Sequence, residues 1–399
     1  MSDQLTHTGP VTQPNSTARK ARHAAHGRSR RAERDTHACG TVVLVPARNE
    51  EAGLHQGLMS LSRQTQRPDM IIVIVNNSTD ATEQIAKDFA ARPDSPLTHV
   101  LVLDDNPHKK AGALNTGIDY IQRTTGMRLE SAARFVVVMD ADTEFHPSFL
   151  MRALRVLGND ASLGGVSAAC RGRHTQPRSL WQRFLLGMQR IEYGRYAYTR
   201  IRRDVHTMSG AGSVYRTSAV QGLLDWRGEV FWQDARNLVE DYETTLALKE
   251  TGWAVTANQW CVAYTDLMPT LPTLVRQRQR WVRGTVDTLR QRGWAKHTWM
   301  SIMSIIVGIV GFLYMIAWMG MTLSASLRHG LHVHPAYLAL PVFWSAYSAW
   351  TVRHLGVRSV LVEACLLPEF LFNLLRAYWL IASVLVSYTS RRRPAAWSE

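Results

Sequence analysis

Cysteine is scarce in this chain, and the four that occur stand far apart in the sequence. Cys39, Cys170, Cys261 and Cys365 form no C-x-x-C pair. This spacing argues against a zinc site and against a disulfide framework. It predicts reduced thiols, as is usual in cytosolic surroundings.

The first 38 residues lack two further features. They contain no apolar core, which argues against a secretory signal, and no Phe, Trp or Tyr, which argues against nucleic-acid binding by base stacking. They carry seven Lys or Arg against three acids. This composition predicts a disordered basic tail over residues 1–38, with contact to anionic lipid headgroups as a further role.

Acidic residues are outnumbered across the whole chain. The 399 residues include 46 Lys and Arg and 32 Asp and Glu, for a formal net charge of +14. Such an excess favours nucleic acid, anionic lipid or a phosphorylated substrate as a partner. Much of it lies in the tail and beside the apolar C-terminal segments, so we expect no nucleic-acid partner.

Short apolar runs alternate with helix-like segments over the first 150 residues. Four of the runs are typical of buried parallel strands: 41–46, 70–75, 100–103 and 135–139. We expect Pro46 to end the first, because proline cannot continue a central ladder. Thr79 or Asp80 is expected to cap the helix that runs to about Ala91. The alternation predicts a doubly wound α/β fold, with a parallel sheet and helices on both faces.

Two aspartates, Asp140 and Asp142, directly follow the last of these strands. Ligands of open α/β sheets collect at the carboxyl ends of the strands. Two carboxylates at this spacing can meet one divalent cation, which usually completes its shell with substrate phosphate oxygens. A solvated Asp-x-Asp turn is the alternative. The preceding buried strand favours the metal.

Farther along the chain, a glycine turn and an acidic pair stand out. The turn at 209–212 enters a strand that runs to Arg216, and its missing side chains allow a ligand to approach the backbone. Glu240 and Asp241 begin a helix that Gly252 ends. Taken alone, the acidic pair is also typical of an ordinary helix N-terminus, because acids there complement the helix dipole.

A helix rich in arginine and aromatic residues is expected at 179–202, and a second, basic helix is expected at 274–290. The second carries Gln277, Arg280 and Trp281. Gln277 and Trp281 are four residues apart and therefore share one helix face. A tryptophan on a basic helix beside a membrane is often an interfacial anchor, which is the structural alternative to a binding role.

The composition of the chain changes after this helix. Trp299–Leu323 is 25 residues without a charge, long enough to span a bilayer. Pro335–Val352 and Phe370–Thr389 are expected as further spans, and Ser359–Pro368 is too short to cross alone. Three spans would place the basic residues 391–393 outside, against the positive-inside tendency, whereas four would keep them inside. Both topologies stay open.

One pair of charges lies at the start of the last predicted span, with the acid directly before the span and the arginine inside it. Glu369 and Arg376 are seven residues apart, two helical turns, so they can meet on one helix face. A functional role and snorkelling of the arginine toward the interface are both consistent with this spacing.

In this order, the motifs resemble those of membrane-bound family-two glycosyltransferases, the inverting group that includes cellulose, chitin and hyaluronan synthases and ceramide glucosyltransferase. The motifs are Val45-Pro-Ala-Arg-Asn-Glu50, Asn76-Asn-Ser-Thr-Asp80, Lys110-Ala-Gly112, Asp140-Ala-Asp142, Ser209-Gly-Ala-Gly212, Glu240-Asp241 and Gln277-Arg-Gln-Arg-Trp281. Gln-x-x-Arg-Trp is the most specific of them. The resemblance covers about Thr41 to Gly284 and includes the trailing apolar helices.

The resemblance implies a GT-A-like, Rossmann-like catalytic domain with a mostly parallel sheet at 39–268. Amphipathic interface helices would follow at 269–295, a membrane region of three or four transmembrane helices at 296–390, and a basic tail at 391–399.

The resemblance also implies site roles. Asp142 would contact Mg²⁺ or Mn²⁺, with Asp140 beside it toward the nucleotide, and Asp241 would be the general base, with Glu240 as its neighbour. The residues implied to bind the nucleotide are Pro46, Ala47, Arg48, Glu50 and Asn76. Those implied at the diphosphate and the acceptor are Lys110, Gly210, Gln277, Arg280 and Trp281. Asn76 and Asn77 stand where many relatives carry an acid that accepts a hydrogen bond from uracil. An asparagine carbonyl can still accept that bond, so UDP stays the favoured donor nucleotide.

The function implied is inverting transfer of a sugar from a nucleotide-sugar donor, with UDP favoured, to a growing polysaccharide at the cytosolic face of the cell membrane. The alternative acceptor is a membrane lipid that receives a single sugar. A catalytically silent membrane protein is a third hypothesis, which the intact acids argue against. Membrane lipids are expected partners, and an oligomer stays open.

Overall fold

The computed structural model describes residues 39–173, 175–199, 204–234, 237–329 and 336–389. The tails predicted at 1–38 and 391–399, and the last residues of the helix predicted at 179–202, lie outside the described residues.

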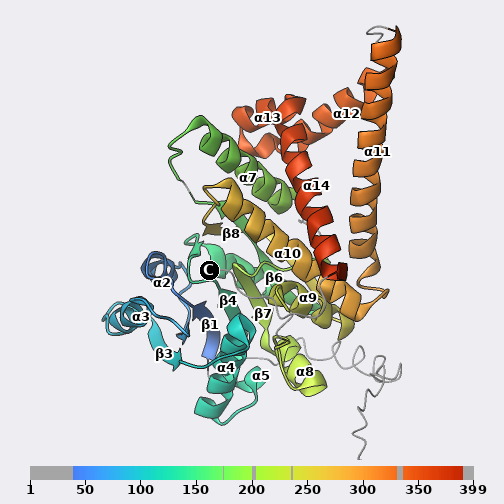
Figure 1. The fold of residues 1–399 in the computed structure, drawn as a ribbon. Helices are drawn as coiled ribbons and strands as arrows, with labels where there is room; N and C mark the ends of the chain where they lie inside the picture. Colours follow the sequence, from blue (N-terminus) through green and yellow to red (C-terminus); the bar gives the residue numbers. More distant parts are fainter. Residues whose placement is uncertain (1–38, 174, 200–203, 235–236, 330–335, 390–399) are drawn as a thin grey trace, which may run out of the picture. The chain divides into compact units, whose positions relative to one another are not determined.

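The structure contains a mixed α/β domain followed by long apolar helices (Figure 1). The strands are β1 (Cys39–Ala47), β2 (Met70–Asn76), β3 (Leu97–Leu103), β4 (Ala133–Met139), β5 (Glu144–Phe145), β6 (Leu163–Gly172), β7 (Gly212–Arg216) and β8 (Ala254–Thr265). The helices are α2 (Leu54–Ser62), α3 (Thr82–Ala90), α4 (Lys109–Thr125), α5 (Leu129–Ala132), α6 (Phe149–Asn159), α7 (Leu180–Thr199), α8 (Thr217–Arg227), α9 (Glu240–Glu250), α10 (Leu271–Arg292), α11 (Trp299–His329), α12 (Ala336–Thr351), α13 (Val357–Ala364) and α14 (Leu366–Thr389), with a short 3₁₀ turn at Arg353–Leu355.

The described strands form one sheet in the order β3-β2-β1-β4-β7-β6-β8-β5. Strands β3, β2, β1 and β4 are parallel, as are β6 and β8, so the predicted mostly parallel sheet is confirmed. Strand β7 lies between β4 and β6 and runs antiparallel to both, so the sheet is mixed rather than purely parallel. Its first residue, Gly212, pairs with Met139. The glycine turn before β7 therefore lies beside Asp140.

The prediction that Pro46 ends the first strand is wrong. β1 continues to Ala47, and Pro46 is in register with Ile74 of β2. The register with β4 ends earlier, at the pair Leu44–Val138. Pro46 thus pairs with a strand on only one side. Because it lies beyond the part of β1 that is paired on both sides, its missing N–H interrupts no central ladder.

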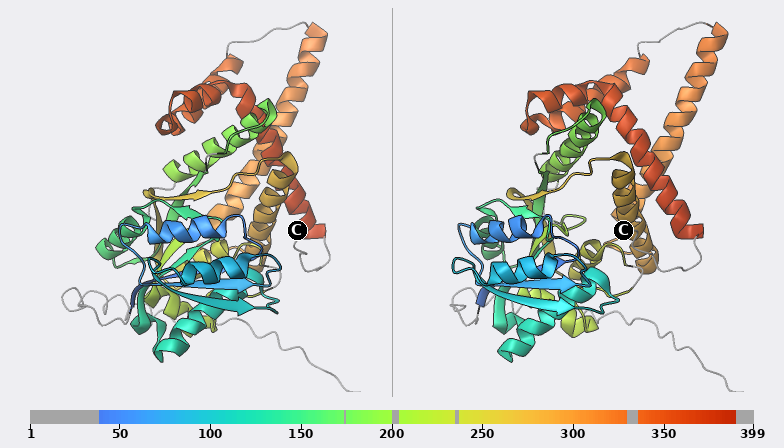
Figure 2. Two further views of the ribbon diagram at one scale, coloured as in Figure 1. Left: turned by 90° about the vertical axis from the view of Figure 1, so that its left-hand side faces the viewer. Right: turned by 60° about the vertical axis from the view of Figure 1, so that its left-hand side comes forward.

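Helices cover both faces of the sheet, as predicted (Figures 1 and 2). One apolar core packs α2, α3 and α6 on one face, and a second packs α4, α5, α8 and α9 on the other. The predicted cap of α3 needs a correction: Ala81 is the N-cap residue and makes no side-chain capping bond. Asp80 lies one residue earlier, and its Oδ1 accepts from the Thr82 N–H at 3.0 Å.

Among the described residues, two helical segments are long and apolar enough to cross a membrane, Trp299–Arg328 and Leu367–Thr389. They contain the first and third predicted spans. Of the second predicted span, Pro335 lies outside the described residues and the rest contains α12, which has 16 residues. At 1.5 Å per residue, these 16 described residues extend over less than a hydrocarbon core about 30 Å thick. The segment expected at the interface, Ser359–Pro368, overlaps the last six residues of α13 and the first three of α14.

Candidate active site

Strand β4 and helices α4 and α9 bring predicted acids together at the carboxyl end of β4. Lys110, at the start of α4, lies at the centre of the group. Its Nζ is 2.6 Å from Oδ1 of Asp140 and 2.6 Å from Oε1 of Glu240, the first residue of α9. The lysine expected at the diphosphate therefore joins the Asp-x-Asp motif to the Glu-Asp motif, which are 100 residues apart in the sequence.

Asp241 is fixed by main-chain donors. The Gly210 N–H donates to its Oδ2 at 2.9 Å, and the Tyr242 N–H donates to its Oδ1 at 2.7 Å. A side chain at position 210 would place its Cβ 3.2 Å from both Asp241 Oδ2 and Lys110 Nζ. Only glycine gives the carboxylate this close approach without displacing it, which explains the glycine turn seen in the sequence.

The two acids at the start of α9 have opposite pKa shifts. Burial and the adjacent charge of Glu240 raise the pKa of Asp241 from 3.8 to about 6. Burial acts in the same direction on Glu240, but the charge and hydrogen bond of Lys110 outweigh it and lower the pKa of that carboxyl. Glu240 is thus held ionised by Lys110, while Asp241 exchanges its proton nearer to neutrality, as a general base requires.

Asp142 lies against the start of α2. A Cβ at Gly53 would lie 3.2 Å from the Cα of Asp142, and one at Gly57 would lie 2.7 Å from the carbonyl oxygen of Ala141. These two glycines allow the helix to approach the loop closely. On another side, Arg173 Nη2 donates to the main-chain oxygen of Asp142 at 2.5 Å. The loop is therefore held from both α2 and the end of β6.

The region around Asp142 has an excess of negative charge. Burial and the charge of Asp140 raise the pKa of Asp142 to about 6. Burial, followed by the charges of Asp142 and Asp140, raises the pKa of Glu50 to about 8. Asp266 contributes to both shifts. Carboxylates that disfavour one another's ionisation in this way fit a divalent cation between them.

The protein itself offers such a cation few ligands. Over the described ranges, no group of three or more His, Cys, Asp and Glu side chains is arranged to hold a metal ion. Asp140 and Asp142 would therefore supply one or two carboxylates, and the remaining ligands would be substrate phosphates and water. This donor set is the usual one for Mg²⁺ in phosphate chemistry.

The two loops predicted to bind the nucleotide are tied to each other. Asn49 Oδ1 accepts from the Thr79 N–H at 2.8 Å, and the Glu50 N–H donates to Thr82 Oγ1 at 2.8 Å. Of the residues predicted there, Ala47 is buried and Arg48 is exposed. Arg48 is close enough to Lys109 that its charge, after burial, lowers the lysine's pKa.

Asn76 is buried, and its Oδ1 accepts from Asn106 Nδ2 at 2.8 Å. Asn77, at a positive φ of 49°, exchanges two hydrogen bonds with the main chain of Asn106. Both asparagines thus support the loop that leads into Lys110. The predicted bond from a base to Asn76 would have to share this oxygen.

The Gln-x-x-Arg-Trp motif lies on α10. Trp281 packs against an apolar cluster that includes Val239 and Tyr242, the residues on either side of the Glu240–Asp241 pair. The charge of Arg280 contributes to the lowered pKa of Glu240. Gln277 Oε1 accepts from Arg278 Nη1 at 3.4 Å. The motif therefore lies beside the acidic pair, although it is about 40 residues away in the sequence.

Sequence reasoning missed several residues of the site. Arg173 donates a hydrogen bond to the main chain of Asp142, and the charge of Asp266 raises the pKa of that aspartate. Asn106 orients the loop before Lys110, and Arg278 contacts Trp281. The first three stand outside every motif, and Arg278 occupies one of the two unspecified positions of Gln-x-x-Arg-Trp. No local pattern in the sequence marks them.

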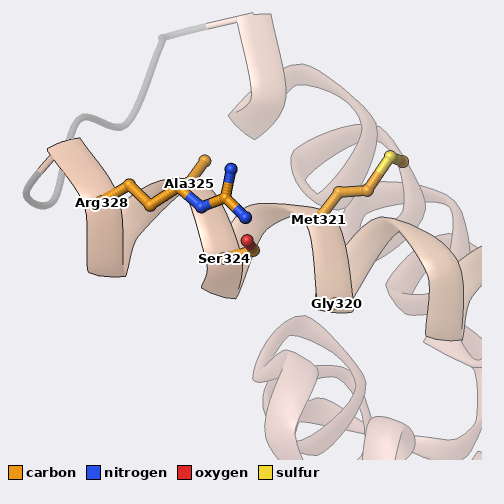
Figure 3. A pocket seen from close by; sticks show the side chains of 5 residues that line it. All are labelled: Gly320, Met321, Ser324, Ala325 and Arg328. Carbon is orange, nitrogen blue, oxygen red and sulfur yellow. The ribbon is translucent and has the colours of Figure 1, made fainter.

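Two hollows differ in their relation to this site. One is lined by Gly320, Met321, Ser324, Ala325 and Arg328, all from α11 (Figure 3), and it contains none of the acids. The other is lined by residues that include His108, Lys110, Asn237 and Glu240. It opens directly beside the lysine that joins the two acidic motifs, so this hollow belongs to the site.

Comparison with known protein families shows the family to which this chain belongs. Residues 38–284, well over half of the chain, match the family described as glycosyltransferase like family 2. This chain belongs to glycosyltransferase family 2. The family 2 domain ends within α10, three residues after Trp281, so it includes every motif that carried the resemblance.

The family 2 chain is similar to two curated proteins over part of their length. The probable glycosyltransferase YdaM of Bacillus subtilis (strain 168) is 27% identical over 251 residues, which are 61% of this chain and 54% of that protein. Hyaluronan synthase 3 of Xenopus laevis is 24% identical over 309 residues, 68% of this chain and 54% of that protein. This chain thus spans about half the length of these relatives.

Among solved structures, the mannosyltransferase PcManGT from Pyrobaculum calidifontis, in complex with GDP-Man and Mn²⁺, resembles the family 2 chain with a TM-score of 0.56 at 17% identity. The likeness covers 94% of this chain and 97% of that one. At this identity it concerns the fold alone, and it supports the predicted GT-A-like architecture.

Proposed function

We propose that this chain transfers a sugar from a nucleotide diphosphate donor to an acceptor at a membrane surface, with inversion at the sugar carbon. The observation that carries the proposal is the convergence of Asp140, Lys110, Glu240 and Asp241 at one edge of a family 2 domain. The acids were predicted from separate motifs, and a shared site is what the chemistry requires.

Asp142 and Asp140 would hold Mg²⁺ or Mn²⁺, which supplies positive charge to the departing diphosphate. Lys110 and Arg280 add fixed positive charge on the side of Glu240. Arg48 and Lys109 lie close enough to interact at the nucleotide loops, where a phosphate would relieve their mutual repulsion. These four cations suit a donor with two phosphates.

Asp241 is assigned as the general base. It would accept the proton of the attacking acceptor hydroxyl, and the Gly210 and Tyr242 N–H groups keep its carboxylate oriented for that step. Trp281, packed beside α9, would stack on the acceptor sugar, with Gln277 on the same face of α10. Pro46, Ala47, Glu50 and Asn76 remain the proposed nucleotide contacts.

UDP is the proposed nucleotide, as the resemblance implied. GDP is the main alternative, since the structurally similar mannosyltransferase was solved with GDP-Man and Mn²⁺. For the acceptor, the similarity to hyaluronan synthase 3 favours a growing polysaccharide. A membrane lipid that receives one sugar is the alternative, because only two described helices are long and apolar enough to help enclose a polymer channel.

We further propose that the catalytic domain faces the cytosol at the cell membrane. The two long apolar helices support membrane attachment, and the four cysteines are free thiols, which suits reducing surroundings. The number of spans and an oligomeric assembly remain predictions from the sequence.

The test begins with a screen of nucleotide sugars for Mn²⁺-dependent release of nucleoside diphosphate by the detergent-solubilised chain. With the donor found, Asp241→Asn is expected to abolish transfer while nucleotide binding persists, since position 241 contacts the acceptor hydroxyl. Asp119→Asn, at an exposed position of α4, is the matched control and should transfer at the normal rate. Normal turnover by Asp241→Asn would contradict the assignment of the base.

The same donor, radiolabelled and incubated with membranes, separates the two acceptors. A polysaccharide synthase gives a product of high mass, whereas a lipid-directed enzyme gives one organic-soluble product. Absence of turnover with every donor would instead favour the catalytically silent alternative.

A further inference from the structure

Six charged side chains from four helices form a cluster beside the Gln-x-x-Arg-Trp motif. Three acids balance three arginines, and we call them the interhelical charge cluster. Its members are Glu192 and Arg195 from α7, Arg278 from α10, Glu363 from α13, and Glu369 and Arg376 from α14. The predicted proximity of Glu369 and Arg376 on one face of their helix is confirmed, and the pair is part of this larger cluster.

The contacts run without a break from α10 to α14. Arg278 Nη2 is 2.5 Å from Glu192 Oε2, and the other oxygen of Glu192 is 3.6 Å from Arg376 Nε. Arg376 and Arg195 both lie 3.0 Å from Oε1 of Glu369. Arg195 also pairs with Glu363. The position of Arg278 is therefore coupled to the apolar C-terminal helices.

This cluster is a poor source of stability. Arg278 is only 4% exposed and Glu192 only 8%. Removing two such ions from water is unfavourable, and apolar replacements of buried ion pairs are often neutral or stabilising. A role in geometry accounts for the cluster better than a role in stability does.

Arg278 has a second set of contacts that indicates this role. Its guanidinium carbon lies 4.4 Å from the centre of the Trp281 ring and 5.5 Å from that of Tyr193. Its Nη1 also donates to Gln277 at 3.4 Å. One buried guanidinium thus touches both motif residues proposed to meet the acceptor, while Trp281 packs in turn against residues that flank Asp241.

We propose that Arg278 is a positioning residue for the acceptor: it fixes the Trp281 ring relative to Asp241 and is itself held by the interhelical charge cluster. The inference rests on the proposed function, in which Trp281 contacts the acceptor. A planar guanidinium is needed because it stacks on the indole while it binds the Glu192 carboxylate. A lysine ammonium offers the charge without the plane.

The test compares two activities of the full chain. Transfer is measured with labelled donor and the endogenous acceptor of native membranes, and donor hydrolysis to water is measured in detergent without acceptor. We expect Arg278→Met to lower transfer about tenfold or more and to leave hydrolysis within about twofold. Arg278→Lys keeps the pairing with Glu192 and should fall between Met and the unmodified chain in transfer. Arg276→Gln, at an exposed position of α10, is the control and should match the unmodified chain in both activities.

The outcomes separate the inference from the function on which it rests. If the unmodified chain neither hydrolyses nor transfers any donor, the proposed function fails. If it transfers, and Arg278→Met transfers equally well, Arg278 does not position the acceptor site. Parallel loss of both activities in the Met and Lys variants also overturns the inference, because Arg278 would then support the whole domain.

Discussion

The pKa of Asp241 makes the pH dependence of transfer a quantitative test of the site. Burial and the charge of Glu240 raise this pKa from 3.8 to about 6. A general base must be ionised before it accepts a proton, so kcat/KM should fall below pH 6 with unit slope. Between pH 7 and pH 5 the expected loss is about tenfold, whereas a carboxylate with an ordinary pKa would lose only about a tenth.

Glu240→Gln tests the cause of this shift. It removes the adjacent negative charge and leaves Lys110 paired with Asp140, so the pKa of Asp241 should decrease. We expect the acidic limb of the pH profile of kcat/KM to move to lower pH by on the order of one pH unit. It should not reach 3.8, because burial is the largest cause of the shift and is unchanged.

The assay measures kcat/KM from pH 4.5 to 8.5 in both proteins, at two Mn²⁺ concentrations tenfold apart. The metal series is the control, because the pKa of Asp142 is also raised to about 6. A limb caused by proton competition at the metal moves with Mn²⁺ concentration, whereas one caused by Asp241 does not. An acidic limb that stays in place or moves upward in Glu240→Gln would refute the electrostatic account of this site.

Three further outcomes are expected. The pKa of Glu50 is raised to about 8, so ionisation of this carboxyl destabilises the folded state progressively from pH 4.5 to 8. In the presence of EDTA, Glu50→Gln should therefore raise the melting temperature by about 4 °C at pH 8.5 and by much less at pH 5. For the same reason, Mn²⁺ binding near pH 7 should release protons from Glu50 and Asp142, visible by calorimetry as an enthalpy that depends on the buffer; no proton release would show that the cation binds elsewhere. Gly57→Ala should lower metal-dependent turnover and should lower the free energy of unfolding by about 1–3 kcal/mol, because the new Cβ would lie 2.7 Å from the Ala141 carbonyl oxygen. Gly158→Ala is the control and should be tolerated, since nothing lies within 4 Å of a Cβ at that position of α6. Equal behaviour of the two variants would count against the close packing of α2.

Elements whose signals are local were predictable from the sequence. The apolar runs before Asp142 and Asn76 have the length and composition of buried parallel strands, and such strands place their carboxyl ends at one edge of the sheet. The positions of the motifs at these strand ends therefore implied one shared site. Pro46 was misjudged because the limits of its neighbouring strands are not local information.

The tertiary structure alone decided which charges from distant parts of the sequence meet. Lys110 joins Asp140 to Glu240, and Gly210 orients Asp241. Each of these contacts joins residues about 30 or more positions apart, brought together by the reversed strand β7 and by the packing of α9. A pKa depends on burial and on neighbouring charges, and both are set only when distant segments pack. The sequence determined which groups are present and at which edge, and the packing determined their ionisation.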